Sequence, residues 1–388
     1  MNPRERVESD IFVDKYRQSI GKSSEVSLSK RALHSLQRTQ GKTHAGIVVP
    51  NFQQLTNALF GFRGVTLLTA PYGIGKTTFT LNIALEVARG GSCKVVYITS
   101  EMSAVRLVTR LLTDMAKPKD KGGGHALTMQ RILVGDSNIS SIERKKAEEL
   151  GLPHLGTLQL EQFQEAVKEF QSLEGDSLHI VDMNDIGSME WSRSKGEHAL
   201  TPLERKVDEL TGKVNEYTGR GAEVLVILDT IAHLEIQPNS VGGGLVDYKD
   251  DLSQDRDITA GLRAWRDYLG DNRALLAVHE ESKARSGSGD GHSVRGSSRY
   301  AYGADALIQM TYADSDRNTD GTVSLGLRDH NPSDEIAQVD AIINKARDGG
   351  TAGVTIPLDH HWHEARMYEV GTCFTKKDII DARRERKK

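Results

Sequence analysis

The stretch TAPYGIGKTTFTLNIALEVARG, residues 69–90, decides the fold, because it places a glycine-rich turn between a strand and a helix. The apolar residues 65–69 predict a short buried strand directly before the turn. After the turn, the stretch from Lys76 to about Arg89 predicts a helix that ends at a pair of glycines. A strand, a tight turn and a helix in this order are the start of a βαβ unit.

The turn itself is close to the phosphate-binding pattern G-x-x-x-x-G-K-[ST], with Ala70 in place of the first glycine. Backbone N–H groups at a helix N-terminus attract phosphate, and Gly73 and Gly75 let the chain approach it closely. Lys76 supplies a cation for the β- and γ-phosphates, and the Thr77 hydroxyl is suited to Mg²⁺. The alternative is a glycine-rich turn that carries a surface lysine. We predict ATP and Mg²⁺ as cofactors, with the nucleotide bound by Ala70, Pro71, Tyr72, Gly73, Ile74, Gly75, Lys76, Thr77 and Thr78.

Two acids follow later strands. Glu101 comes after the apolar stretch 94–99, where a carboxylate can activate the attacking water, although it would also suit a helix N-cap. Asp229 ends the apolar strand 224–228, which is the form of a Walker B residue that holds Mg²⁺ directly or through water. We predict Glu101 as a catalytic residue and Asp229, with Thr77, as a metal-binding residue.

Further polar groups follow the later strands. His279 ends the strand 274–278 and is predicted to sense the γ-phosphate, with a structural histidine as the alternative. The loop after it holds Lys283, Arg285, Arg295 and Arg299, which suit a phosphodiester backbone unless the loop is only a solvated surface. Lys345 and Arg347, in NKARDGGTAG, would reach a neighbouring subunit's γ-phosphate as an arginine finger, or form an ordinary charged turn.

Strands that alternate with helices predict an α/β fold with a mostly parallel, doubly wound sheet. We divide the chain into an N-terminal arm, 1–46, an ATPase domain, 47–370, with an insertion at 117–160, and a basic tail, 371–388. Further helices are expected at 28–40, 103–115, 141–150, 161–170, 201–219 and 259–269, and further strands at 178–181, 306–310, 323–328 and 341–344.

Composition limits the classes of protein. The 388 residues are 37% apolar and 27% charged, and no run of 18 apolar residues would span a membrane. The two cysteines, Cys93 and Cys373, argue against a fold built on disulfides, so we expect a cytoplasmic protein with no membrane partner. The net charge of −4 gives no overall attraction to nucleic acid.

At this point the sequence resembles a known family. FRGVTLLTAPYGIGKTTFTLNIALEVA, KVVYITSEMSAVRLVTRLL and NKARDGGTAGVTIPL are similar to the ATPase domain of DnaB-type ring helicases, and HEESKA with RGSSRYAYGADA resembles the RepA-type plasmid helicases. The resemblance covers roughly residues 50–366. The family usually has glutamine where His279 stands, and its N-terminal collar domain has no counterpart in the sequence, which favours a phage, plasmid or similar element.

The resemblance implies a RecA-like P-loop fold and a hexameric ring around single-stranded DNA, moving 5′→3′, with a loader or primase as further partners. It implies that Lys76 and Thr77 bind phosphate and Mg²⁺, that Glu101 is the base, and that Lys345 and Arg347 act on the next subunit. It also places Arg295, Gly296, Ser297 and Ser298 in the DNA-gripping loop. Two other classes stay open: a RecA-like recombination or mediator ATPase that forms filaments, and a non-helicase regulatory ATPase.

Overall fold

The computed structural model describes most of the chain from residue 40 to residue 375. The described residues are 40–116, 127–135, 139–187, 190–191, 195, 197–212, 223–234, 237–238, 251–269, 273–280, 297–312, 336–347, 349–371 and 373–375. The chain divides into two compact units, and the smaller, Met1–Thr43 with Asn215–Gly219, lies almost wholly outside these residues. The larger unit, His44–Val214 with Arg220–Lys388, contains the central sheet.

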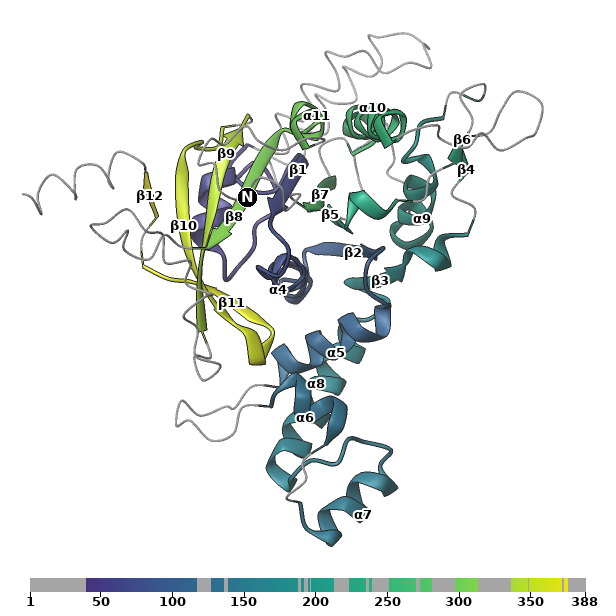
Figure 1. Cartoon of the computed structure of the whole chain (residues 1–388), viewed down its shortest axis with the longest axis vertical. Coiled ribbons are helices and arrows are strands. Elements are labelled where there is room, and N and C mark those ends of the chain that lie inside the picture. The colour runs from purple at the N-terminus through teal and green to yellow at the C-terminus, as the bar shows by residue number, and fades with distance from the viewer. Residues whose placement is uncertain are drawn as a thin grey trace, which may run out of the picture. The chain divides into compact units, whose positions relative to one another are not determined.

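The central sheet forms the middle of the larger unit, and the helices α5 to α8, within residues 104–173, extend beyond it on one side (Figure 1). In the described part of the chain it has 10 strands, in the order β11-β10-β9-β8-β1-β7-β5-β2-β3, with β12 paired to β10. The strands are β1 Gly64–Ala70, β2 Cys93–Thr99, β3 Leu178–Asp182, β5 Glu223–Asp229, β7 Arg273–Glu280, β8 Ala306–Tyr312, β9 Ile336–Ala346, β10 Val354–His361, β11 Arg366–Glu369 and β12 Phe374–Thr375. A separate pair joins β4, Glu190–Trp191, to β6, Gln237–Pro238.

The direction of the strands divides the sheet into two parts. From β8 through β1, β7, β5 and β2 to β3 every neighbouring pair is parallel. The strands β9, β10, β11 and β12 extend it with antiparallel pairs. The sheet therefore confirms the predicted α/β class with a mostly parallel sheet. Because the carboxyl ends of β1, β2, β5 and β7 meet at one edge, their terminal polar residues are brought together there.

Helices cover both faces of the parallel part (Figure 1). One face, which carries Leu68 and Ile227, packs against α4, Lys76–Arg89, α5, Ala104–Met115, and α8, Thr157–Leu173. The other face, which carries Leu67 and Val226, packs against α9, Thr201–Thr211, α10, Asp251–Leu269, and α11, Ser297–Gly303. Alternate residues of each strand point to opposite faces, so the strands read as continuous apolar runs, as expected for a sheet buried on both sides.

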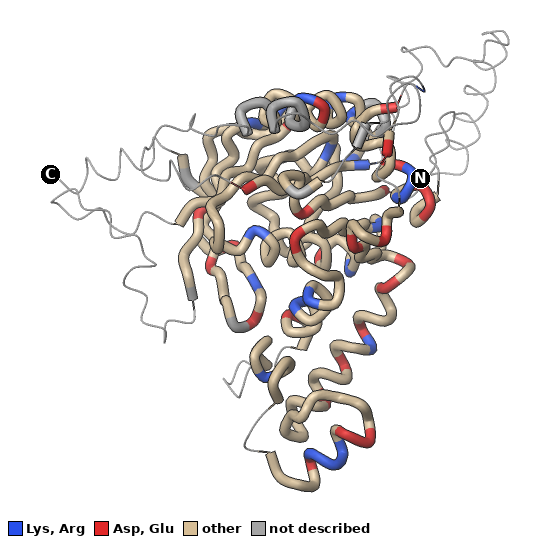
Figure 2. The backbone as a smooth tube through the Cα atoms, turned by 45° about the vertical axis from the view of Figure 1, so that its right-hand side comes forward, with Lys and Arg blue, Asp and Glu red and all other residues tan. Residues whose placement is uncertain are grey.

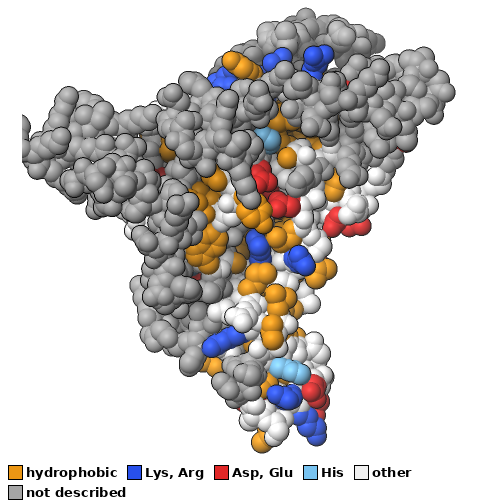
Figure 3. Space-filling view, in the orientation of Figure 1, with side chains coloured by type: hydrophobic (Ala, Val, Ile, Leu, Met, Phe, Trp, Pro, Cys, Tyr) orange, Lys and Arg blue, Asp and Glu red, His pale blue; other side chains and the backbone are white. Residues whose placement is uncertain are grey.

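The predicted insertion contributes to the core of the larger unit. It contains α6, Met129–Val134, and α7, Ser141–Glu149, and its side chains Leu127, Ala147 and Leu155 are buried in the same cluster as α4. A capping box between Ser140 and Glu143 starts α7. The segment that contains α7 carries charges of both signs (Figure 2), and hydrophobic side chains are exposed among polar ones on the helices below the sheet (Figure 3).

Several element boundaries differ from those predicted. The helix expected at 201–219 ends at Thr211, because Gly212 takes a φ of 81° and breaks it, so the longer helix was wrong. The helix expected at 259–269 begins eight residues earlier, at Asp251, and the strand expected at 341–344 is part of the longer β9. The helix α3, Gln53–Leu59, was not predicted. The helix predicted at 28–40 and the strand at 323–328 lie outside the described residues, apart from residue 40.

None of the described helices combines the length and the apolar character that a membrane span requires.

Candidate active site

The glycine-rich turn forms the loop that the sequence predicts between β1 and α4. Ala70 is the last residue of β1, so the position without the usual glycine has ordinary extended geometry. Gly73 and Gly75 have φ values of 83° and 102°, in the region that other residues rarely adopt. A Cβ atom on Gly75 would lie 2.4 Å from His360 Cε1, so glycine is also required for space.

The side chain behind the loop is His360, on β10. It is 1% exposed, and burial lowers its pKa to about 4, so the imidazole is neutral near neutral pH. Its ring lies against the ring of Trp362, with centroids 3.8 Å apart. The sequence did not reveal the contact with Gly75, because the two residues are far apart in the chain and meet only through the antiparallel strands. The consequence is that the phosphate loop rests on the C-terminal hairpin of the sheet.

Lys76 begins α4 and folds back over the loop. Its Nζ donates hydrogen bonds to the carbonyl oxygens of Ala70 and Pro71, at 3.3 and 3.0 Å. The side chain is buried, at 8% exposed, so its charge is kept within the concave side of the loop. This is the position from which an ammonium group reaches phosphate oxygens bound by the loop.

Asp229 lies at the centre of the site, 3% exposed. Its Oδ2 accepts hydrogen bonds from the Thr77 hydroxyl, at 2.8 Å, and from the Tyr97 hydroxyl, at 2.7 Å. Its Oδ1 is buried, with no hydrogen-bond partner among the described residues. Burial raises the pKa of Asp229, and the hydrogen bonds from Tyr97 and Thr77 oppose that rise.

The same oxygens fit a magnesium ion. Mg²⁺ prefers hard oxygen ligands and in phosphate sites takes one or two from the protein. Thr77 offers a hydroxyl oxygen, and Asp229 offers the buried Oδ1 that lacks a described partner. The predicted pair of metal-binding residues is therefore brought together, with donor atoms of the right chemistry.

Glu101 follows β2 by two residues, and its side chain is exposed at the same edge of the sheet. Thr99, the last residue of β2, pairs with Asp229 of β5, so Glu101 lies two residues beyond the strand end that neighbours Asp229. The exposed carboxylate has access to water. The geometry suits the predicted role as a general base.

Arg110 is a site residue that the sequence analysis missed. It lies on α5, and burial lowers its pKa, whereas the negative charges of Asp229 and Glu101 oppose that effect. Leu107 and Leu111, on the same helix, are fully buried, so a residue at 110 faces the core side of α5. The sequence does contain a signal for this residue, because Arg110 interrupts the apolar positions that repeat every 3.6 residues along the helix. Its charge is placed near the two acids of the site.

His279 belongs to β7, at the same edge, with Thr69 of β1 beside it in the register. Its ring meets that of Tyr300 edge to face, with centroids 5.0 Å apart. Tyr300 is on α11, the helix that also contains Ser297 and Arg299. The contact connects the strand end beside the phosphate loop to the predicted DNA-binding segment. Lys283, Arg285, Arg295 and Gly296 lie outside the described residues.

Lys345 and Arg347 lie far from the phosphate loop of the same chain. Arg347 follows β9 and bonds through its backbone N–H to the Asp305 carbonyl, next to the first residues of β1. The loop begins at the other end of β1, and a strand of seven residues spans roughly 20 Å. The Lys345 Nζ donates to the carbonyls of Ala301 and Ala304, at 2.7 and 2.6 Å, at the end of α11.

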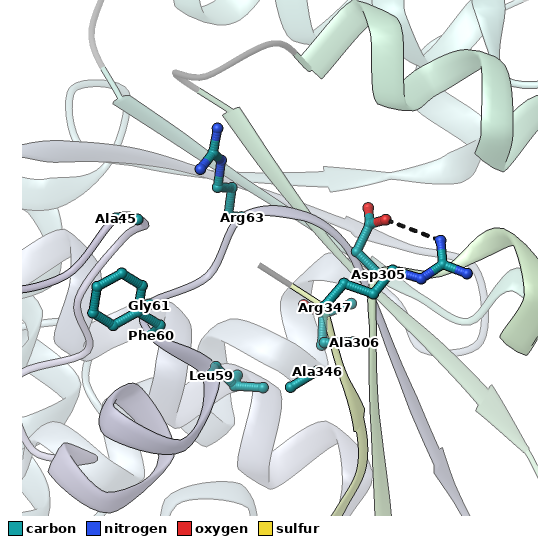
Figure 4. A pocket seen from close by; sticks show the side chains of 10 residues that line it. Ala45, Leu59, Phe60, Gly61, Arg63, Asp305, Ala306, Ala346 and Arg347 are labelled. Atoms are coloured by element: carbon teal, nitrogen blue, oxygen red, sulfur yellow. Dashed lines mark ion pairs between the residues drawn. The ribbon is translucent and has the colours of Figure 1, made fainter. Parts of the chain in front are cut away.

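The surroundings of Arg347 are shown in Figure 4. One guanidinium nitrogen lies 3.7 Å from Asp305 Oδ1, and the side chain is 49% exposed. Asp305 is held more firmly by Arg266, at 3.0 Å. A small pocket beside Arg347 is lined also by Phe60 and Arg63. Arg347 is thus presented at the surface, with a long ion pair to Asp305.

The fold is that of the RecA-like P-loop ATPase domains. Residues 48–152, which include the phosphate loop and Glu101, match the family model described as an AAA domain. No curated protein sequence matches the chain.

Solved structures extend the likeness to most of the chain. One of them, described as an ATPase domain, is 16% identical, with a TM-score of 0.59, over 90% of this chain and 100% of that one. A DnaB-like replicative helicase, described with its interactions with primase, is 15% identical, with a TM-score of 0.56, over 95% of this chain and 73% of that one. The chain therefore has the RecA-type fold of the DnaB-like helicase ATPase domains, as its sequence motifs indicated.

Proposed function

We propose that the protein is an ATP-driven DNA helicase motor, in which copies of this chain form a ring around single-stranded DNA. The observation that carries this proposal is the separation of Arg347 from its own phosphate loop by the length of β1. An arginine finger at that place completes a site only on another subunit. Two copies, head to tail, are therefore needed for one complete site, and head-to-tail contacts generate rings when they close.

The proposed chemistry follows from the placement of the side chains. The loop amides and Lys76 bind the phosphates, and Glu101 orients and deprotonates the attacking water. Mg²⁺, when held by Thr77 and Asp229, neutralises charge on the phosphate oxygens. His279 reports the state of the γ-phosphate to α11 through Tyr300, whose ring it contacts. The loop before α11, with Arg295, would then change its grip on the DNA backbone.

The proposal extends to biological context. A hexameric ring, 5′→3′ movement, and replication of a phage, plasmid or similar element are what the family resemblance supports. The primase that interacts with the DnaB-like neighbour makes a primase or a loader a candidate partner. We also propose a cytoplasmic location, because the two cysteines argue against a fold built on disulfides.

The first test is ATP hydrolysis with and without single-stranded DNA, together with unwinding of a forked duplex that has a 5′ tail. Hydrolysis stimulated by DNA, with unwinding, is the expected result. Stimulation without unwinding would favour a recombination or mediator ATPase, which forms filaments on DNA. Hydrolysis that DNA does not change would favour a regulatory ATPase with a protein partner.

Replacing Glu101 with glutamine is expected to lower the hydrolysis rate about a hundredfold, because the amide cannot accept the proton of the attacking water. ATP affinity should stay near the wild-type value, since Glu101 contributes no group to the phosphate loop. Single-turnover hydrolysis and equilibrium binding of a fluorescent ATP analogue measure the two effects. Glu149→Gln, at the exposed end of α7, is the matched control. Normal turnover in the Glu101 variant would remove this residue from the site.

A further inference from the structure

Tyr97 is a buried phenol beneath the first turn of α4. It belongs to β2, where Tyr97 pairs with Ile227 and Thr99 pairs with Asp229 of the neighbouring strand β5. Residues two apart on a strand share a face, so Tyr97 and Asp229 both point toward α4. Tyr97 is fully buried, and its ring packs in the core cluster on that side of the sheet.

The hydroxyl of Tyr97 is the donor in its hydrogen bond with Asp229. It lies 2.7 Å from Asp229 Oδ2, and an ionised carboxylate only accepts, so the phenol donates. The Thr80 hydroxyl lies 2.9 Å from the same phenol oxygen. Thr77 donates to Asp229 Oδ2 as well, at 2.8 Å. The chain Thr80–Tyr97–Asp229–Thr77 therefore ends at the phosphate loop.

The hydroxyls of Tyr97 and Thr77 both donate to Oδ2 of Asp229, and this arrangement determines what Oδ1 can bind. Two hydrogen bonds to Oδ2 from different residues fix the rotation of the Asp229 carboxylate. They leave Oδ1, which is buried and has no described hydrogen-bond partner, for a cation or its water. Because Thr77 uses its proton on Asp229, the lone pairs of its oxygen stay available to the same cation.

If Tyr97 only filled space in the core, it would not need its hydroxyl group. Phenylalanine fills nearly the same volume as tyrosine, and a buried hydroxyl costs free energy unless it is hydrogen-bonded. The described partners of this hydroxyl are Thr80 and Asp229, both next to the phosphate loop.

We propose that Tyr97 is a positioning residue for the divalent cation that accompanies the nucleotide. Its phenol holds the Asp229 carboxylate in the rotation that presents Oδ1 beside the Thr77 hydroxyl. Tyr97 does not touch the nucleotide, and it acts only through Asp229. This inference rests on the proposed nucleotide-binding function of the loop.

The test is the Mg²⁺ dependence of nucleotide binding in Tyr97→Phe. Binding of a fluorescent ATP analogue is measured first in EDTA and then across a Mg²⁺ titration. The half-saturating Mg²⁺ concentration is expected to rise about tenfold, the usual effect of losing a hydrogen bond to a charged group. Affinity in EDTA should be unchanged, because the loop amides and Lys76 are intact. A general loss of structure would weaken binding in both conditions.

Two further variants separate positioning from stability. Thr56→Val, on α3, removes another fully buried hydroxyl, which bonds to the Val49 backbone, and it should leave the Mg²⁺ dependence unchanged. Thr80→Val removes the second partner of the phenol, and it should shift the Mg²⁺ dependence in the same direction by a smaller factor. It also provides the measurement if Tyr97→Phe does not fold.

The outcomes are distinct. An unchanged Mg²⁺ dependence in Tyr97→Phe, or an equal loss of affinity with and without Mg²⁺, overturns the positioning role while the proposed function stands. A wild-type protein that binds no nucleotide in either condition overturns the proposed function, and the role of Tyr97 with it.

Discussion

Replacing Arg347 with alanine is expected to lower ATP hydrolysis about a thousandfold, the lower end of the range for an arginine finger. Nucleotide affinity should change little, because Arg347 lies at the far end of β1 from its own phosphate loop. Stability should also change little, since its ion pair with Asp305 spans 3.7 Å and the side chain is 49% exposed. Steady-state hydrolysis and equilibrium nucleotide binding measure the first two effects.

A mixing experiment decides whether Arg347 acts on another subunit. Arg347→Ala keeps an intact phosphate loop, and Lys76→Ala keeps an intact Arg347, so each variant alone lacks one half of every site. When the two are mixed and allowed to exchange subunits, some interfaces contain both intact halves, and hydrolysis should partly recover. Arg144→Ala, an exposed position on α7, is the control for loss of a surface arginine. A mixture as inactive as its components would contradict a trans role.

Replacing Arg366 with methionine is expected to destabilise the protein by about 3–5 kcal/mol, because it removes the cation that two buried carboxylates share. The Arg366 guanidinium lies 2.9 Å from Asp114 and 3.0 Å from Glu86, which are 1% and 3% exposed. These acids come from α5 and α4, and Arg366 comes from β11, so one side chain joins three elements. Glu86 also forms an ion pair with Arg89, so part of its negative charge stays compensated in the variant.

Urea unfolding of the protein without nucleotide measures this loss. Arg205→Met is the matched control, because Arg205 pairs with Glu197 at the surface and its side chain is 55% exposed. The control should cost less than about 1 kcal/mol. Equal midpoints for the two variants would show that the Arg366 pairs contribute no more than a surface ion pair.

The sequence predicted those parts of the candidate site whose position depends only on neighbouring residues in the chain. The loop from Ala70 to Thr77, and the acids Glu101 and Asp229, follow buried strands directly, and parallel strands bring such positions to one edge. Tyr97, Arg110 and His360 were not predicted, because their roles depend on which elements pack together. Tyr97 reads as an ordinary strand residue until β5 is known to pair with β2.

The same distinction applies to the fold. The parallel strands and α4 stand out as apolar runs with clear ends, and they were predicted nearly to the residue. The start of β9 and the whole of β11 were not predicted, because these antiparallel strands carry polar residues among the apolar ones and their pairing depends on distant partners. Gly212 was a visible stop signal for α9, and the charged pattern beyond it led to the wrong boundary.

The place of β1 in the middle of the sheet also affects when this strand can pair during synthesis of the chain. Its neighbours are β7, where Val65 pairs with Leu275, and β8, where Thr66 pairs with Ala306. The ribosome therefore completes the phosphate loop long before the strands that support it exist. Until β7 and β8 have been made, the apolar strand β1 has neither of its neighbours, and exposed apolar strands with unpaired edges are prone to aggregate. Since His360 supports Gly75 from behind, the loop gains this support only after the chain has been synthesised beyond residue 360.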